Sequence, residues 1–250
     1  MDPGDVPWLT TEQMVEVDRA MIEDLHIELL QMMENAGRSL ADLARRRFLG
    51  GDPRGKPVVA LAGTGGNGGG VLVAARRLHG WGARVRVCTT KPGEAFTPVP
   101  AHQLDTLERM RVPVCSVGEL SAEEPPDMIL DGIIGYSLKG APRGGAAELI
   151  CWANAQDRPI LSLDAPSGVD TTTGQAFDPA IRARATMTLA LPKKGLRGPG
   201  VEELAGELYL ADIGVPPSLY AGPGLALEVG PVFAHEDVIR VSLDSGQEAE

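Results

Sequence analysis

Residues 58–70 read Val58-Val59-Ala60-Leu61-Ala62-Gly63-Thr64-Gly65-Gly66-Asn67-Gly68-Gly69-Gly70, an apolar run followed by a loop with six glycines in eight positions. The run is typical of a strand buried on both faces of a parallel sheet. Glycine lets the backbone turn sharply and approach a ligand closely. A helix is expected after the loop as far as about His79, and the start of a helix favours phosphate. The stretch therefore predicts a strand, a phosphate-binding loop and a helix.

Two common phosphate-binding patterns fit this loop poorly. No Lys-Ser/Thr pair follows it, so it is not a Walker loop. Gly63, Gly65 and Gly68 match the spacing G-x-G-x-x-G of the dinucleotide pattern, but that match alone has low specificity. A tight turn without a ligand is the alternative, although such a turn needs only one or two glycines.

The rest of the chain alternates apolar runs with helical patterns. Further strands are expected at 85–88, 112–115, 128–130, 160–163 and 185–190, and helices at about 102–110 and 146–155. This alternation predicts right-handed crossovers and a mostly parallel sheet. The fold class is therefore α/β, a three-layer α/β/α sandwich of Rossmann-like type.

Two helices are expected before the first strand. Thr10 and Gln13 have the spacing of a capping box at the start of the first helix. The second helix is expected over about residues 29–48. The inward faces are predicted to carry Met14, Val17 and Met21 in the first helix, and Leu30, Met33, Gly37, Leu40 and Ala44 in the second.

Composition excludes several classes of protein. The 250 residues are 43% hydrophobic, which is ordinary for a globular protein and excludes a mainly disordered chain. No stretch of about 18 apolar residues occurs, so no membrane span is expected. The formal net charge of −11 argues against a general nucleic-acid binder, which needs a basic surface.

A single domain over residues 1–250 is expected, with frayed tails at 1–9 and about 240–250. The first five residues lack the basic and apolar regions of a secretory signal. Three widely spaced cysteines without a C-x-x-C pattern favour reduced, buried thiols in a cytoplasmic protein. They are Cys88, Cys115 and Cys151.

Two more clusters follow predicted strands. Residues 131–140 begin with Asp131 and carry a single lysine, Lys139, in a loop bounded by glycines. Residues 164–170 begin with Asp164 and read Asp-Ala-Pro-Ser-Gly-Val-Asp. Because ligands of such sheets bind outside the carboxyl ends of the strands, these loops are candidate site segments. The alternatives are a solvated surface lysine and a simple Pro-Ser-Gly turn.

Other chemistries are poorly supported. Ser167 does not lie in a Gly-x-Ser-x-Gly motif, which argues against a serine hydrolase. The four histidines are scattered, which argues against a transition-metal site. Oxygen donors are plentiful instead at Asn67, Asp131 and Ser167, and hard cations prefer such ligands.

Six motifs in order resemble the YjeF N-terminal domain family, whose enzymatic members are NAD(P)H-hydrate epimerases, over about residues 10–216. The glycine loop and the two clusters above resemble the family patterns G-P-G-N-N-G-G-D-G, D-A-x-F-G-x-x-x-x-G and D-I-P-S-G-x-D. The other three are Met33-Glu34-Asn35-Ala36-Gly37, Pro192-Lys193-Lys194-Gly195 and Ala211-Asp212-Ile213-Gly214-Val215-Pro216, similar to M-E-N-A-G, P-K-x-G and A-D-I-G-I-P.

The resemblance implies a K⁺ ion and a hydrated NADH or NADPH substrate. It places the potassium ligands at Asn67, Asp131 and Ser167. It also implies a homodimer and a separate NAD(P)H-hydrate dehydratase, because no dehydratase domain follows in this chain. The implied substrate-binding residues are Gly66, Asn67, Gly68, Gly69, Gly70, Gly135, Tyr136, Ser137, Leu138, Lys139, Gly140, Ala141 and Asp164.

Two positions depart from the family pattern. Gly66 stands where the family has Asn, and Gly70 stands where it has Asp. Each lost hydrogen bond to a ligand costs about 0.5–1.5 kcal/mol. The three implied potassium ligands are retained, so the sequence favours a divergent active member.

The expected reaction is epimerisation at C6 of the nicotinamide ring. An acid protonates the C6 hydroxyl, the ring nitrogen expels it, and water returns from the opposite face. Asp164 is the candidate acid/base and Lys139 its electrostatic helper. The alternatives are a non-catalytic nucleotide-binding or scaffold member of the family, and a different nucleotide-processing enzyme on the same fold.

Overall fold

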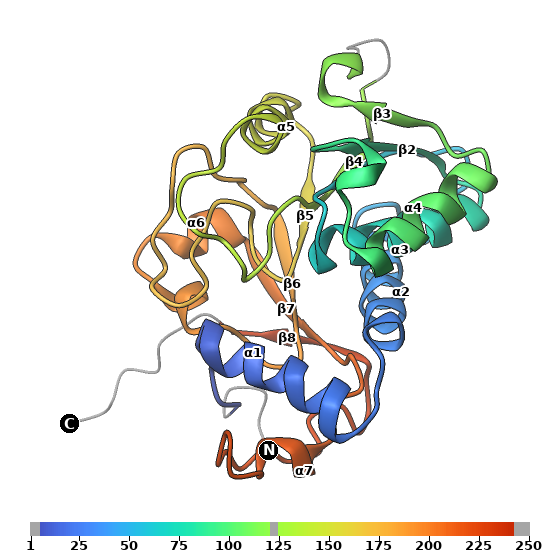
Figure 1. Ribbon diagram of the computed structural model, residues 1–250. Coiled ribbons are helices and arrows are strands. Elements are labelled where there is room, and N and C mark those ends of the chain that lie inside the picture. The colour runs from blue at the N-terminus through green and yellow to red at the C-terminus, as the bar shows by residue number, and fades with distance from the viewer. Residues whose placement is uncertain (1–5, 121–124, 243–250) are drawn as a thin grey trace.

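The computed structural model describes residues 6–120 and 125–242 and shows an eight-stranded sheet between helices (Figure 1). The strand order is β3-β2-β1-β4-β5-β6-β7-β8, parallel except for the last pair. The strands are β1 (Pro57–Ala62), β2 (Arg84–Thr89), β3 (Val114–Ser116), β4 (Met128–Gly132), β5 (Ile160–Leu163), β6 (Ala185–Leu189), β7 (Glu207–Ala211) and β8 (Val238–Val241).

Helices cover both faces of the sheet, which confirms the expected three-layer α/β/α sandwich. The helices α2, α3 and α4 lie on one side in Figure 1, and α5 and α6 lie on the other. The α-helices are α1 (Thr11–Arg19), α2 (Leu29–Arg47), α3 (Gly66–Gly80), α4 (Pro98–Arg109), α5 (Gly145–Asn154), α6 (Val201–Ala205) and α7 (Pro217–Tyr220).

The α1 helix crosses one end of the sheet instead of covering a face (Figure 1). Its capping box forms as predicted between Thr10 and Gln13, and Met14, Val17 and Met21 are buried. They pack with residues that follow β6 and β7, such as Leu191 and Ile213. The helix continues into one π-helical turn, Ala20–Asp24. Through this placement α1 closes the space above the carboxyl ends of the strands.

The second helix packs closely on the helix that follows the glycine loop. The predicted inward residues Met33, Gly37, Leu40 and Ala44 are buried, but Leu30 is 40% exposed. The prediction that Leu30 faces inward was therefore wrong. Leu30 lies in the first turn of α2.

Parts of both predicted tails are ordered. Val6 and Leu9 are buried, and the backbone of Leu9 bonds with Pro192 and Lys194. Residues 238–241 form β8, which pairs with β7. Leu9 and residues 240–241 were expected to fray. They are ordered instead, because each segment forms backbone hydrogen bonds with a neighbouring segment. Residues 1–5 and 243–250 lie outside the described part of the chain.

The cysteines do not share one environment. All three are free thiols, but only Cys88 is buried, whereas Cys115 is half-buried and Cys151 is exposed on α5. The expectation of three buried thiols was therefore wrong for Cys151. Within the described residues, no helix is long and apolar enough to span a bilayer.

Candidate active site

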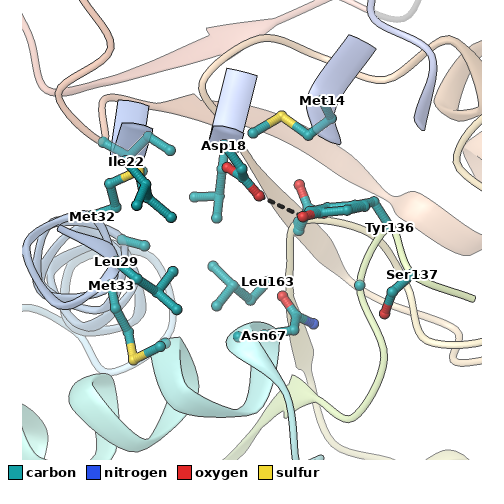
Figure 2. A pocket seen from close by; sticks show the side chains of 17 residues that line it. Met14, Asp18, Ile22, Leu29, Met32, Met33, Asn67, Tyr136, Ser137 and Leu163 are labelled. Carbon is teal, nitrogen blue, oxygen red and sulfur yellow. Dashed lines mark hydrogen bonds between the residues drawn. The ribbon is translucent and has the colours of Figure 1, made fainter. Parts of the chain in front are cut away.

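A cavity of about 320 Å³ lies at the carboxyl edge of the sheet, between the strand ends and the two N-terminal helices. Its wall is mainly apolar, with side chains from α1, α2 and the ends of β5 and β6 (Figure 2). The lining residues are Met14, Asp18, Ile22, Leu29, Met32, Met33, Ala36, Gly66, Asn67, Gly70, Gly135, Tyr136, Ser137, Leu163, Asp164, Leu189 and Ile213.

The glycine loop contributes the start of α3 to this cavity. Gly66 and Asn67 form the first turn, after the N-cap Gly65. A Cβ on Gly66 would meet nothing within 4 Å, so the space beside it is open. The α3 N-terminus therefore presents free N–H groups next to an open part of the cavity, which suits an anion.

Packing explains three glycines of the loop, Gly68, Gly69 and Gly70. A Cβ on Gly68 would lie 1.9 Å from the carbonyl oxygen of Gly63, and one on Gly69 would lie 2.5 Å from Sδ of Met33. Both residues are buried and neither lines the cavity. At Gly70, which does line it, a Cβ would lie 2.5 Å from Leu163. Leu163 thus occupies the space that a side chain at position 70 would need.

The loop after β4 reaches the cavity with only part of its predicted residues. Gly135, Tyr136 and Ser137 line it, and Gly135 lies directly against the side chain of Asn67. The next four residues do not line it: Leu138 and Gly140 are half-buried, and Lys139 and Ala141 are exposed.

Asp164 is paired with a lysine other than the predicted one. Lys193 Nζ lies 2.5 Å from Asp164 Oδ1 and donates a 2.7 Å hydrogen bond to the carbonyl of Leu189. Lys193 is 0% exposed and Asp164 is 3% exposed. Lys139, the predicted helper of Asp164, is exposed and does not line the cavity, and its role stays a prediction.

The backbone of Asp164 is held in an uncommon conformation. Its φ is +68°, in the left-handed region that non-glycine residues seldom adopt. The N–H of Asp164 donates to the carbonyl of Met187 at 2.7 Å, which ties this turn to β6. A strained backbone next to a buried ion pair is typical of a functional position.

A second carboxyl group lines the cavity from α1. The hydroxyl of Tyr136 donates a hydrogen bond to Asp18 (Figure 2). Burial raises the pKa of Asp18, and the hydrogen bond from Tyr136 and the charge of Lys193 only partly oppose this shift. Burial and the nearby Asp18 charge also raise the pKa of Tyr136. Asp18 is thus a carboxyl group that holds its proton at a higher pH than an exposed one.

Asp131 and Ser167 meet below the cavity wall, as the sequence predicted. Asp131 is fully buried, and its carboxylate accepts bonds from Ser167 Oγ at 2.6 Å and Ser162 Oγ at 2.8 Å. The backbone N–H groups of Ser167 and Ile133 supply two more, at 3.0 and 3.2 Å. Burial raises the pKa of Asp131, and these donors oppose the shift. The cluster holds together the loops after β4 and β5.

Asn67 has an unsatisfied buried amide. Its Nδ2 atom has no hydrogen-bond partner among the described residues. The two ends of an amide are interchangeable by rotation, so this position could equally present an oxygen. Amide, hydroxyl and carboxylate oxygens, as in Asn67, Ser167 and Asp131, are the ligand types that suit a hard cation. The described residues contain no group of three or more His, Cys, Asp or Glu side chains that could hold a metal ion.

Sequence reasoning missed two polar residues of the site. Lys193 was present in the quoted motif Pro-Lys-Lys-Gly, but nothing in the spacing placed it beside Asp164. Asp18 carried no sequence signal, since an acidic residue on a helix is usually solvated.

Fold and site together define a Rossmann-like α/β protein with a ligand cavity at the carboxyl edge of its sheet. Residues 29–195 match the family model of the YjeF-related protein N-terminus, and the chain belongs to this family.

Relatives and a solved structure agree with this assignment. The chain is 43% identical over 230 residues to an NAD(P)H-hydrate epimerase of Dehalogenimonas lykanthroporepellens, which covers 90% of this chain and 89% of that protein. It is 38% identical to an NAD(P)H-hydrate epimerase of Bordetella parapertussis, over 87% of this chain and 92% of that protein. The crystal structure of yeast ynu0, YNL200c, superposes with a TM-score of 0.78 at 27% identity, covering 94% of this chain and 100% of that chain.

A longer relative matches this chain over less than half of its own length. The chain is 35% identical to the bifunctional NAD(P)H-hydrate repair enzyme Nnr of Pyrobaculum aerophilum over 86% of its residues, but this covers only 44% of that protein.

The buried ion pair yields a prediction about stability. Replacing Lys193 with methionine leaves Asp164 as an uncompensated buried charge, so Lys193→Met should lower the free energy of unfolding by about 3–5 kcal/mol. Denaturant unfolding at neutral pH measures this. The matched control is Lys194→Met, because Lys194 is exposed and should change stability by less than about 0.5 kcal/mol. Equal effects of the two substitutions would contradict the pairing.

Proposed function

We propose that this chain interconverts the R and S forms of hydrated NAD(P)H at C6 of the nicotinamide ring. The observation that carries the proposal is the Asp164–Lys193 ion pair, buried in the wall of an otherwise mainly apolar cavity. Two relatives that match most of this chain are named as NAD(P)H-hydrate epimerases, which supports the same reaction.

The cavity suits the two ends of such a substrate. The apolar side chains of Met32, Met33 and Leu163 can enclose a flat, uncharged ring. The open space at Gly66 and the N-terminus of α3 can accept the phosphates, because the helix dipole favours negative charge there. Lys139, exposed two residues beyond the lining residue Ser137, is free to approach those phosphates from solvent.

The reaction needs both a proton and a stabilising negative charge. When the C6 hydroxyl takes up a proton, it leaves as water, and the lone pair of the ring nitrogen forms a C=N double bond. The ring is then a cation. Water adds to C6 from the opposite face, loses a proton, and gives the other epimer.

We assign the stabilising charge to Asp164. Lys193 Nζ contacts Oδ1 directly, and both side chains are buried. An ionised Asp164 stabilises the cationic ring and can accept the proton of the incoming water. This assignment refines the sequence-based role of Asp164 as acid/base, because the base function is kept and the acid function passes to another group.

We assign the acid function to Asp18. It lines the same cavity, no Lys or Arg lies in direct contact with it among the described residues, and burial raises its pKa. Two carboxyl groups in different surroundings are a common arrangement for acid and base roles at one site. Tyr136 orients Asp18 through its hydroxyl.

The potassium ion expected from the sequence is part of the same proposal. We propose that Asn67, Asp131 and Ser167 hold K⁺, because they offer amide, carboxylate and hydroxyl oxygens and the side-chain amide of Asn67 has an Nδ2 atom without a partner in the described part of the chain. The ion would supply positive charge that fixes the loops after β1, β4 and β5. The homodimer, the cytoplasmic location and the separate dehydratase stay predictions from the sequence.

The proposed reaction predicts that Asp164→Asn abolishes epimerisation. Asparagine tolerates the left-handed backbone at this position, so the fold should survive. The measurement follows equilibration of the two epimers by chromatography that resolves them, corrected for the rate without enzyme. A loss of roughly 100-fold or more is expected.

The matched control for this variant is Asp157→Asn. Asp157 also has a positive φ, of +48°, but it is exposed and does not line the cavity. Full activity in Asp164→Asn would contradict the assignment. If the unaltered protein binds the hydrate without turnover, the chain is instead a non-catalytic nucleotide-binding member of the family. The departures from the family pattern at Gly66 and Gly70 are consistent with that alternative.

The acid role of Asp18 predicts a specific pH dependence. The rate should fall as the pH rises through the raised pKa of Asp18, because only the protonated carboxyl can donate. Tyr136→Phe removes a hydrogen bond to the ionised form, so the fall should move to higher pH. Asp18→Asn should lower the rate roughly 100-fold and remove this limb of the profile.

Glu12→Gln, an exposed change on the same helix, should leave the pH profile as it is. A profile that is unchanged in Tyr136→Phe and in Asp18→Asn would show that another group donates the proton.

The potassium site predicts a cation dependence. Activity should be lost when K⁺ is replaced by tetramethylammonium, which is too large for the cluster, and should return when K⁺ is added. Ser167→Ala should need more K⁺ for half-maximal activity, because it removes one oxygen ligand. Equal rates in the two salts would contradict the proposed potassium site.

A further inference from the structure

Two of the three cysteines face each other on neighbouring strands and take no part in the proposed reaction. Cys88 on β2 and Cys115 on β3 are directly opposite in the parallel register. Their Sγ atoms lie 2.7 Å apart. Neither residue lines the cavity at the carboxyl edge.

The backbone already provides the spacing that a disulfide requires. Neighbouring strands lie about 4.8 Å apart, and bridged cysteines have Cα atoms roughly 4.4–6.8 Å apart. Residues opposite each other in a parallel pair point to the same face of the sheet. Cys88 and Cys115 therefore can be joined without a change of register.

The two thiols differ in a way that separates their chemical roles. Cys115 lies on the edge strand β3 and is half-buried, so a small reagent can reach it, whereas Cys88 is buried. The hydrogen bond between the thiols lowers the pKa of Cys115 and raises that of Cys88, since it favours the thiolate at Cys115. Burial opposes this lowering of the Cys115 pKa, the charge of Arg86 adds to it, and the charge of Glu119 opposes it.

We propose that Cys88 and Cys115 form a reversible dithiol–disulfide site that reacts with hydroperoxides. The Cys115 thiolate attacks one peroxide oxygen, so an S–O bond forms, the O–O bond breaks, and the other oxygen leaves as water after taking a proton. Cys115 is then a sulfenic acid, oxidised by two electrons.

The second step closes the bridge. The Cys88 sulfur attacks the Cys115 sulfur, the S–S bond forms, and the S–O bond breaks. The released hydroxide takes the Cys88 proton and leaves as water. In sum, two thiols and one hydrogen peroxide give one disulfide and two water molecules, and a dithiol reductant reverses the change.

The experiment uses the full chain, reduced and freed of reductant, with hydrogen peroxide as the probe. Remaining thiols are blocked with an alkylating reagent, and peptides are mapped by mass spectrometry. We expect a peptide pair linked through Cys88 and Cys115, lighter by two hydrogens than the free pair, while Cys151 is alkylated. Dithiothreitol should restore all three thiols.

Three variants separate this site from general oxidation. Cys151→Ser, which alters the exposed third cysteine, should form the same link at the same rate. Cys88→Ser should stop at the sulfenic acid of Cys115, which a sulfenic-acid trap detects. Cys115→Ser should leave Cys88 reduced. Circular dichroism checks that each variant is folded, and Cys88→Ala replaces Cys88→Ser if the serine destabilises the strand.

The outcome that overturns the proposal is oxidation of Cys151 while Cys88 and Cys115 remain free thiols, or oxidation of Cys115 in the unaltered protein to the sulfinic acid without a bridge. Because mass is the readout, the result does not depend on whether the chain is an epimerase.

Discussion

The ion pair between Asp164 and Lys193 is the interaction on which the candidate site depends. Removing two charges from water is costly, and such a pair persists only where further bonds satisfy both groups. Here the carbonyl of Leu189 accepts a second bond from Lys193. The lysine segment is itself held by Leu9, which bonds to Pro192 and Lys194 on either side of it. The short segment before α1 thus supports the lysine, and α1 then carries Asp18 to the same cavity.

The parallel sheet explains how residues far apart in sequence meet. The carboxyl ends of β1, β4 and β5 lie side by side, so the loops that follow them share one edge. Asp131 connects the loops after β4 and β5, because its carboxylate accepts bonds from both the backbone N–H and the Oγ of Ser167. A fully buried carboxylate that accepts four hydrogen bonds from the protein is a rigid support beneath the cavity. The ligand site can then be mainly apolar above and polar only where chemistry is needed.

Much of the fold followed from the sequence, since strand and helix patterns in this chain agree with the tertiary structure. The strands at 58–62, 85–88 and 160–163 and the capping box at Thr10 were all predicted from local pattern. The strands β7 and β8 were not, because β7 alternates in burial and β8 is a short edge strand. The sequence placed Asn67, Gly135, Tyr136 and Asp164 at a common edge, and the structure has them lining one cavity.

Other parts of the site could not be predicted because they depend on the path of the chain. Lys139 and Lys193 both follow strands, and only the three-dimensional fold shows that Lys193 reaches Asp164. The glycines at 68 and 69 were interpreted as ligand-binding, but they are small because Gly63 and Met33 lie against them. Pattern alone does not distinguish a glycine that admits a ligand from one that admits a neighbouring residue.

The most direct measurement is a crystal structure of the protein with NADPH hydrate and potassium. The account predicts the nicotinamide ring in the cavity beside Leu163, with C6 within hydrogen-bonding reach of both Asp164 and Asp18, and the ion among Asn67, Asp131 and Ser167. A ring bound outside this cavity, or one whose C6 faces only Met32 and Met33, would contradict it.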